Sequence, residues 1–185
     1  MQVTKTSLQD VVIVEPKVFG DDRGFFFEVY NRATFERLGL PGQFVQDNHS
    51  GSQKGVLRGL HYQMRQPQGK LVRVLRGAIF DVAVDLRRGS KQFGQWFGLE
   101  LSAENRRQLW VPPGFAHGFL TLSAFAEVSY KVTELYAPQY ERSLKWDDPA
   151  LGIAWPLEGE PVLSAKDRDG VPLNEAETYT EPISI

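Results

Sequence analysis

The sequence predicts a mainly β protein, a double-sheet jelly roll or a related barrel with a few short helices. Several short segments alternate along the chain with the period of two that a strand requires. Glycine-rich and proline-rich turns separate these segments at intervals close to those of sandwiches and barrels. Only one early segment has a convincing helical pattern. Such a barrel has a mouth wide enough for a small ligand, lined by inward-facing polar residues.

The early helix is expected over ATFERLGL, residues 33–40, with Asn31 as its cap and Gly39 as its end. The centre of the chain is strand-like, because alternation runs from residue 70 to 76, stops at Gly77 and resumes from 78 to 85. Further short strands are expected in QWFGLEL, RQLWVPP, HGFLTLS and AEVSYKVTELY.

The tail from about residue 149 is rich in proline, glycine and acidic residues. We expect an irregular C-terminal extension there, with one short helix around Asn174 to Glu177. No internal repeat and no low-complexity linker divides the chain. Residues 1–185 are therefore predicted to form a single jelly-roll domain.

The composition narrows the possible functions. A net charge of −2 gives no global basic field for nucleic acid. The absence of cysteine excludes a disulfide framework, thiolate metal sites and cysteine nucleophiles. The apolar run Val11 to Val14 is too short for a signal-peptide core, and no stretch approaches the ~20 apolar residues of a membrane span. Cytoplasmic residence and no membrane association are the expectation.

The three histidines are candidates for chemistry: His49, His61 and His117. A lone histidine is more often a surface or structural residue than a catalytic one. His61 stands out because Arg58 precedes it by three residues and Lys70 follows it by nine. Two cations beside a histidine indicate an anion or a developing negative charge.

A jelly roll with histidines raises the question of a metal. Jelly-roll proteins that bind a metal usually present a His-x-His pair, and here Gln63 occupies the position of the second histidine after His61. A site built from all three histidines would use every histidine in the chain. We therefore expect no metal and no redox cofactor. Nucleophile-elbow, phosphate-loop and dinucleotide motifs are missing too, which leaves acid–base chemistry by His, Tyr, Lys and carboxylates.

Seven segments taken together resemble one family, the dTDP-4-dehydrorhamnose 3,5-epimerases. They span about Leu8 to Leu173 and read DDRGFFFEVY, FVQDNHS, VLRGLHYQ, QGKLVRVLRGAIFDVAVDLR, WVPPGFAHGF, SYKVTELYAPQYERSLKWDDP and LSAKDRDGVPL. The resemblance implies a cupin-like double-stranded β-helix. It also implies a homodimer that exchanges its N-terminal segment, a dTDP-4-keto-6-deoxyhexose substrate and no cofactor.

The resemblance assigns four catalytic residues. His61 resembles the base that removes a proton beside the keto group. Asp167 in SAKDRDG resembles the carboxylate that orients this base, and Tyr130 in VSYKV resembles the acid on the opposite face of the sugar. Lys70 in QGKLVRV resembles the cation beside the keto oxygen, where it would stabilise an enolate.

The resemblance also implies a set of ligand contacts. Arg23 and Glu28 would reach across to the nucleotide of the neighbouring subunit, and Tyr136 would stack on its base. Asp81 is expected behind the pocket. The remaining contacts are Gln46, Asp47 and Asn48 in the loop of FVQDNHS, with Arg58, His117, Glu141 and Lys166.

The expected reaction is epimerisation at C3 and C5 of a 4-keto sugar. Relatives on the same scaffold that epimerise only C3 or only C5, or that shift the keto group, stay open as alternatives. A non-catalytic sugar-nucleotide-binding jelly roll is a second alternative, and a metal-dependent cupin oxygenase or isomerase is a third.

Overall fold

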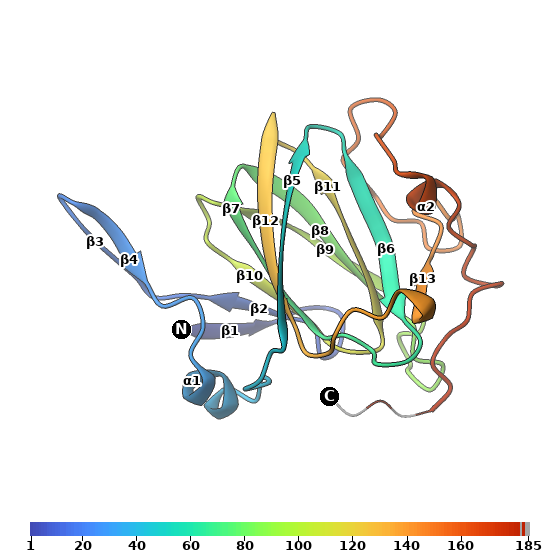
Figure 1. Cartoon of the computed structure of the whole chain (residues 1–185), viewed down its shortest axis with the longest axis horizontal. Helices are drawn as coiled ribbons and strands as arrows, with labels where there is room; N and C mark the ends of the chain where they lie inside the picture. The colour runs from blue at the N-terminus through green and yellow to red at the C-terminus, as the bar shows by residue number, and fades with distance from the viewer. Residues whose placement is uncertain (182, 184–185) are drawn as a thin grey trace.

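The fold is shown in Figure 1 as a computed structural model that describes residues 1–181 and 183. Two antiparallel sheets pack face to face. The six-stranded sheet has the order β1 (Gln2–Lys5), β2 (Val12–Glu15), β10 (Gln108–Val111), β7 (Lys70–Arg76), β12 (Phe125–Val132) and β5 (Gln46–Gln53). The five-stranded sheet has the order β13 (Glu141–Ser143), β6 (Leu57–Gln63), β11 (Phe115–Thr121), β8 (Ala78–Asp85) and β9 (Trp96–Ser102). The predicted mainly β jelly-roll class is confirmed.

The core lies between the two sheets, because alternate residues of each strand point inward. The six-stranded sheet contributes Val72, Val74 and Val128, and the five-stranded sheet contributes Ile79 and Phe119. Burial of each such side chain stabilises the fold by about 1.5–3 kcal/mol. This apolar layer closes the barrel interior and leaves the polar inward positions at one mouth free to form a site.

The outer face of the five-stranded sheet is covered by the C-terminal extension. Leu60 and Val82 of that sheet pack against Leu151, Trp155 and Tyr179. This explains why β8 is buried on both faces and reads as a nearly continuous apolar strand.

The short helix α1 (Arg32–Arg37) lies where the sequence predicted it. The side chain of Asn31 accepts a hydrogen bond from the Thr34 N–H at 3.1 Å, and Gly39 follows with a φ of +75°. The buried Phe35 anchors the helix on Trp110 and Leu71, on the outer face of the six-stranded sheet.

The central strand predictions are also confirmed. Strands β7 and β8 are separated at Gly77, whose φ is +73° and whose added Cβ would meet the Phe125 carbonyl oxygen at 2.2 Å. Strands β9 to β12 fall on the four predicted apolar segments, with ends shifted by up to four residues. The polar strands β5 and β6 were not predicted.

The prediction of a short helix around Asn174 to Glu177 is wrong. A turn closed by the Glu175 N–H and the Pro172 oxygen (3.0 Å) occupies this stretch. Hydrogen bonds between this stretch of the tail and the barrel fix its conformation, since the Tyr179 N–H donates to the Leu86 oxygen at 3.1 Å. A one-turn helix, α2 (Ala165–Arg168), forms earlier in the tail.

A two-stranded hairpin, β3 (Val18–Asp21) and β4 (Gly24–Phe27), projects away from the barrel (Figure 1). Three of its aromatic side chains are largely exposed: Phe19 (53%), Phe25 (63%) and Phe26 (71%). A single hairpin is marginally stable in water, and contiguous exposed aromatic groups are typical of interaction sites. Among the described residues, no helix has the length and apolar character that a membrane span requires.

Candidate active site

The barrel contains a polar cavity of about 410 Å³ between the two sheets. Most of the predicted site residues line this cavity, although they come from six strands, one helix and one loop. They are Gln46, Asn48, Arg58, His61, Lys70, His117, Tyr130, Tyr136, Glu141, Lys166 and Asp167. The volume lies in the range that holds a small-molecule ligand.

His61 and Asp167 form a hydrogen-bonded pair in the wall of this cavity, with Asp167 buried and His61 partly exposed. Strand β6 supplies His61, and its Nε2 lies 2.7 Å from Oδ1 of Asp167. The first turn of α2 supplies Asp167, which also accepts hydrogen bonds from the Gly59 N–H (3.0 Å) and the Ser164 hydroxyl (2.5 Å). Because Nε2 donates to the carboxylate, Nδ1 of His61 keeps its lone pair and can act as a base.

The protonation states of Asp167 and His61 allow His61 to act as a base. Burial alone would raise the pKa of Asp167, but hydrogen bonds from His61, Ser164 and Gly59 outweigh it and lower this pKa well below its usual range. Burial lowers the pKa of His61, and the hydrogen bond to Asp167 opposes that shift only in part. At neutral pH the pair is therefore an anionic carboxylate and a neutral imidazole.

Gly59 allows the strands to approach closely beside this pair. A Cβ at Gly59 would lie 2.5 Å from Cα of Gly118 on the neighbouring strand, and its φ is +125°. No larger residue fits there without moving the backbone. The close approach of β6 to β11 places the Gly59 N–H within hydrogen-bond distance of Asp167.

Lys70 lies at the floor of the cavity with a side chain that is almost fully buried. Its Nζ donates to the carbonyl oxygen of His61 at 3.1 Å. Burial lowers the pKa of Lys70 to about 8, although Glu141 and Asp81 both favour its charged form. A cation in this poorly solvated position can stabilise a developing oxyanion.

Tyr130 reaches the cavity from the opposite sheet. It lies on β12 of the six-stranded sheet, whereas His61 lies on β6 of the five-stranded sheet. Burial raises the pKa of Tyr130, so the phenol keeps its proton at neutral pH. A base and a proton donor thus face the cavity from opposite sides.

Hydrogen bonds order the mouth of the cavity around Glu141. Its carboxylate accepts from Nζ of Lys166 and from the hydroxyl of Tyr136, each at 2.8 Å. Burial would raise the pKa of Glu141, but these two contacts lower it overall. The backbone N–H of Tyr136 donates to the side chain of Gln46 at 3.0 Å. Arg58 donates to the Ser52 hydroxyl at 3.0 Å and supplies a further cation.

Three predicted ligand contacts lie outside this cavity. Asp47 points outward from β5 and pairs with Lys131 at 2.9 Å, since its neighbours in the strand face inward. Arg23 lies at the tip of the β3–β4 hairpin, where it pairs with Asp21 and its side chain is 90% exposed.

The prediction that residues 46–48 lie in a loop is wrong, because they lie on β5.

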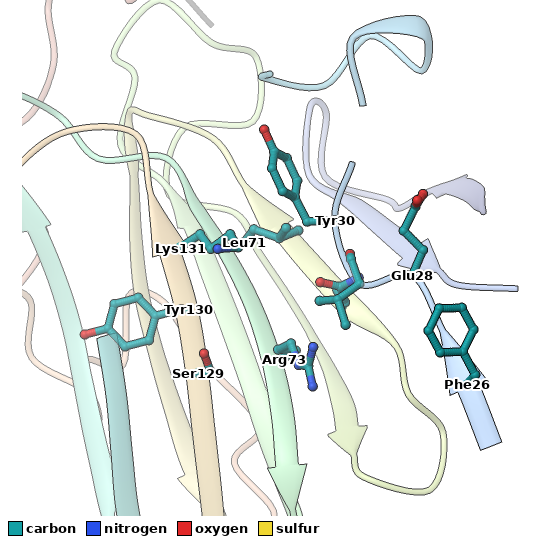
Figure 2. Close-up of a pocket in the computed structure, with 10 residues that line it drawn as sticks. Phe26, Glu28, Tyr30, Leu71, Arg73, Ser129, Tyr130 and Lys131 are labelled. Carbon is teal, nitrogen blue, oxygen red and sulfur yellow. The ribbon is translucent and has the colours of Figure 1, made fainter. Parts of the chain in front are cut away.

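Glu28 lines a second cavity, of about 540 Å³, on the outer face of β7 and β12 (Figure 2). In Figure 2, Phe26 and Glu28 lie across this cavity from Arg73, and the hydroxyl of Tyr130 points away from it. Tyr130 therefore borders both cavities but directs its phenol toward the one that contains His61.

The three histidines do not converge. His49 lies on the outward side of β5, where its Nε2 is 3.3 Å from Glu127, while His61 and His117 face the cavity. Among residues 1–181 and 183, no group of three or more histidine or acidic side chains is arranged to hold a metal ion.

Four further cavity residues were missed in the sequence: Ser50, Gln68, Phe119 and Ser164. The period of two could have found Ser50 and Phe119, since they follow Asn48 and His117 by two residues on the same strands. Ser164 could have been found from the spacing Ser-x-x-Asp of a helix cap. Gln68 lies in an irregular segment that carries no such signal.

Comparison with known proteins identifies the family. A family model described as dTDP-4-dehydrorhamnose 3,5-epimerase matches residues 5–175. The dTDP-4-dehydrorhamnose 3,5-epimerase of Pseudomonas aeruginosa is 59% identical over 180 residues, covering 97% of this chain and 99% of the relative. That of Salmonella typhimurium is 60% identical over 178 residues, covering 95% and 97%.

A solved structure gives the same answer. The dTDP-6-deoxy-D-glucose-3,5-epimerase of Legionella pneumophila, crystallised with dTDP-4-keto-L-rhamnose, superposes with a TM-score of 0.95 at 50% identity. The match covers 98% of this chain and 99% of that one. This chain belongs to the dTDP-4-dehydrorhamnose 3,5-epimerase family.

Proposed function

We propose that this protein epimerises dTDP-4-keto-6-deoxy-D-glucose at C3 and C5 to give dTDP-4-keto-L-rhamnose, as a step of dTDP-rhamnose biosynthesis. The observation that carries the proposal is the opposed placement of His61 and Tyr130 on two facing sheets. Inversion of a carbon needs removal of a proton from one face of the sugar and its return from the other. A neutral imidazole and a protonated phenol supply these two roles at neutral pH.

The other residues of the cavity fit the same chemistry. C3 and C5 both flank the C4 carbonyl, so loss of either proton gives an enolate whose charge collects on the oxygen at C4. Lys70 is the cation proposed to stand beside that oxygen. Asp167 holds His61 in the tautomer with a free Nδ1, and a correctly placed base contributes roughly 10²–10⁴-fold to the rate.

A nucleoside diphosphate supplies charges that the mouth of the cavity can bind. Arg58 and Lys166 bring two cations to the lining of the cavity, where Lys166 pairs with Glu141. Lys166 would exchange its contact with Glu141 for the diphosphate, and Tyr136, whose ring is half exposed, would stack on the base.

The sequence identity of this chain to its relatives favours inversion at two carbons of the sugar over inversion at one. The relatives named 3,5-epimerases reach 59% and 60% identity. ChmJ of Streptomyces bikiniensis, a 3'-monoepimerase solved with dTDP-quinovose, is 35% identical with a TM-score of 0.86, covering 91% of this chain and 86% of that one.

Proton NMR in deuterium oxide tests the proposal directly. The enzyme is mixed with dTDP-4-keto-6-deoxyglucose, and deuterium entry is followed at each carbon. Exchange at both C3 and C5 is expected. Exchange at one carbon alone would make the protein a monoepimerase, and binding without exchange would leave only the sugar-nucleotide-binding alternative.

The proposal includes a homodimer in which the β3–β4 hairpin completes the neighbour's site. In one chain, Arg23 and Glu28 lie away from the cavity that contains His61. The hairpin carries exposed aromatic groups and projects from the barrel, which suits a segment that packs on a second copy. Cytoplasmic residence is also part of the proposal, and cell fractionation tests it.

Subunit mixing tests the exchanged hairpin. Arg23→Ala and His61→Ala are each expected to show little activity at low substrate concentration. If Arg23 acts in the neighbouring site, random mixing of the two variants restores about a quarter of the wild-type sites. A mixture no more active than its parents, or a monomeric mass by light scattering, would remove the exchanged hairpin from the proposal.

A further inference from the structure

The cavity contains a second histidine–carboxylate pair that the chemistry above leaves without a role. Nε2 of His117 lies 2.8 Å from Oδ1 of Asp81. Strand β11 supplies the histidine and the adjacent strand β8 supplies the carboxylate. Asp81 is completely buried, and the side chain of His117 is 7% exposed and lines the cavity. The pair therefore lies beneath the cavity, with its imidazole between the carboxylate and the ligand space.

His117 stands directly beside the proposed base. It is the register partner of His61 on adjacent antiparallel strands (β11 and β6, Figure 1). Side chains of directly opposed residues have Cβ atoms about 4.5–5.5 Å apart, which is the width of a six-membered sugar ring. Two imidazoles at this spacing can both contact one bound hexose.

The surroundings of Asp81 make a purely structural role a poor explanation. Its neighbours along β8, Ile79 and Ala83, belong to the apolar core, and its register partners on β11 and β9 are Phe119 and Leu99. Burial of a carboxylate among such groups costs several kcal/mol, and apolar residues of similar size commonly restore or increase stability.

The hydrogen bonding of Asp81 also argues against a purely structural role. Within the described residues, its Oδ2 atom has no hydrogen-bond partner, so His117 is the contact that holds the side chain in place. A buried carboxylate whose hydrogen bond goes to one histidine is placed to orient that histidine.

We propose that Asp81 is a positioning residue that acts through His117. It accepts the Nε2–H of His117 and so fixes the tautomer in which Nδ1 carries the lone pair toward the cavity. There Nδ1 accepts a hydrogen bond from a hydroxyl of the sugar ring and holds the ring at the right distance from His61. This inference rests on the proposed function, because it takes the ligand to be a hexose with free hydroxyl groups.

The charge of Asp81 has a second effect that fits this placement. Burial lowers the pKa of Lys70, and Asp81 is one of two carboxylates, with Glu141, that oppose the shift. Asp81 thus supports the charged state of Lys70 and the orientation of His117 from one position beneath the sugar.

The first experiment reads the tautomer in the unaltered enzyme. Long-range ¹⁵N–¹H NMR of protein labelled at histidine distinguishes a protonated Nε2 from a protonated Nδ1, and the His117→Asn spectrum assigns the signals. The expected result is a protonated Nε2 and an unprotonated Nδ1. A proton on Nδ1 of His117 would overturn the proposal, whether or not any variant of Asp81 folds.

The second experiment is a double-mutant cycle with Asp81→Asn and His117→Asn. Asp81→Asn alone is expected to lower kcat about 10–100-fold with little change in KM, because the lost orientation matters most in the transition state. In the His117→Asn background the loss should be much smaller, because only the support of the Lys70 charge remains to be lost. Equal losses in both backgrounds, or activity within a factor of about two of wild type, would refute a role through His117.

Asp148→Asn is the matched control for loss of a buried carboxylate. Asp148 is 5% exposed, accepts the Leu173 N–H at 2.7 Å and is not among the residues that line the cavity. Its substitution should lower stability and leave kcat unchanged. Turnover by the unaltered enzyme is measured in parallel, so that failure of the proposed function is distinguished from failure of this inference.

Discussion

Replacing Lys70 by methionine should make the protein more stable and nearly inactive. Lys70 is 7% exposed, and burial lowers its pKa from 10.5 to about 8. In the unfolded chain the ammonium is fully solvated, so folding at pH 7 works against the charge. Each unit of pKa corresponds to 1.36 kcal/mol, which puts the free-energy cost at about 3 kcal/mol. Methionine fills similar space without the charge.

The pH dependence of this gain has a definite sign. Below the folded-state pKa of about 8 the cost of burying the charge is fully present. Between about 8 and 10.5 the folded protein loses the proton more readily than the unfolded chain, so wild-type stability recovers. The advantage of Lys70→Met should therefore be greatest at pH 7 and disappear near pH 10.5.

Urea unfolding at pH 7 and pH 10, at equal protein concentrations, measures the difference. The lost hydrogen bond to the His61 oxygen reduces the expected gain, whereas the attraction to Asp81 and Glu141 is already included in the pKa of about 8. A gain of about 1–3 kcal/mol at pH 7 is therefore expected. Lys54→Met is the control, because Lys54 is half exposed and pairs with an exposed Glu158. Its effect should stay within about 0.5 kcal/mol.

The activity of Lys70→Met completes the test. Loss of the cation beside the enolate oxygen should lower kcat about 10²–10³-fold. A variant that is less stable than wild type at pH 7 would refute the burial argument. A variant that keeps near-normal kcat would remove Lys70 from the chemistry, whatever its stability.

Three further predictions follow from the site. Asp167→Asn should lower kcat about 10²–10⁴-fold and stability by about 1–3 kcal/mol, since the amide leaves at least one donor near Ser164 unpaired; kinetics and urea unfolding measure both. Lys166→Met should shift the acid limb of the kcat/KM profile to higher pH, because the Lys166 charge lowers the pKa of His61; an unchanged limb would show that another group titrates. Tyr130→Phe should impair proton return more than proton removal, so deuterium washout should outpace product formation.

The fold class was predictable because the apolar pattern is strong in the middle of the chain. Strands β7 and β8 are rich in apolar residues, and Gly77, whose positive φ marks the break, separates them. Strands β5 and β6 carry Gln, Asn, Ser, Arg and His on their inward side because they form the wall of the cavity. Site strands thus lack the apolar signal by which strands are found, and local pattern alone missed them.

The site itself was assembled from sequence through the resemblance, not through spacing. His61 and Asp167 are 106 residues apart, and no periodicity joins them. The resemblance also included Asp47, which faces outward from its strand while its neighbours face the cavity. Arg23 lies on the projecting hairpin and Glu28 lines the second cavity on the outer face of the barrel, so within one chain neither lines the cavity that contains His61.

The cavity floor shows why stability and chemistry oppose each other here. The core would be more stable with apolar residues in place of Lys70, Asp81 and His117, since a buried charged or polar group costs free energy that its partners must offset. The same burial excludes water, so a fixed cation acts on an enolate oxygen through a poorly screened field. Stabilising substitutions at the floor should consequently lower kcat, whereas equally buried positions of the core, such as Ile79, should affect stability alone.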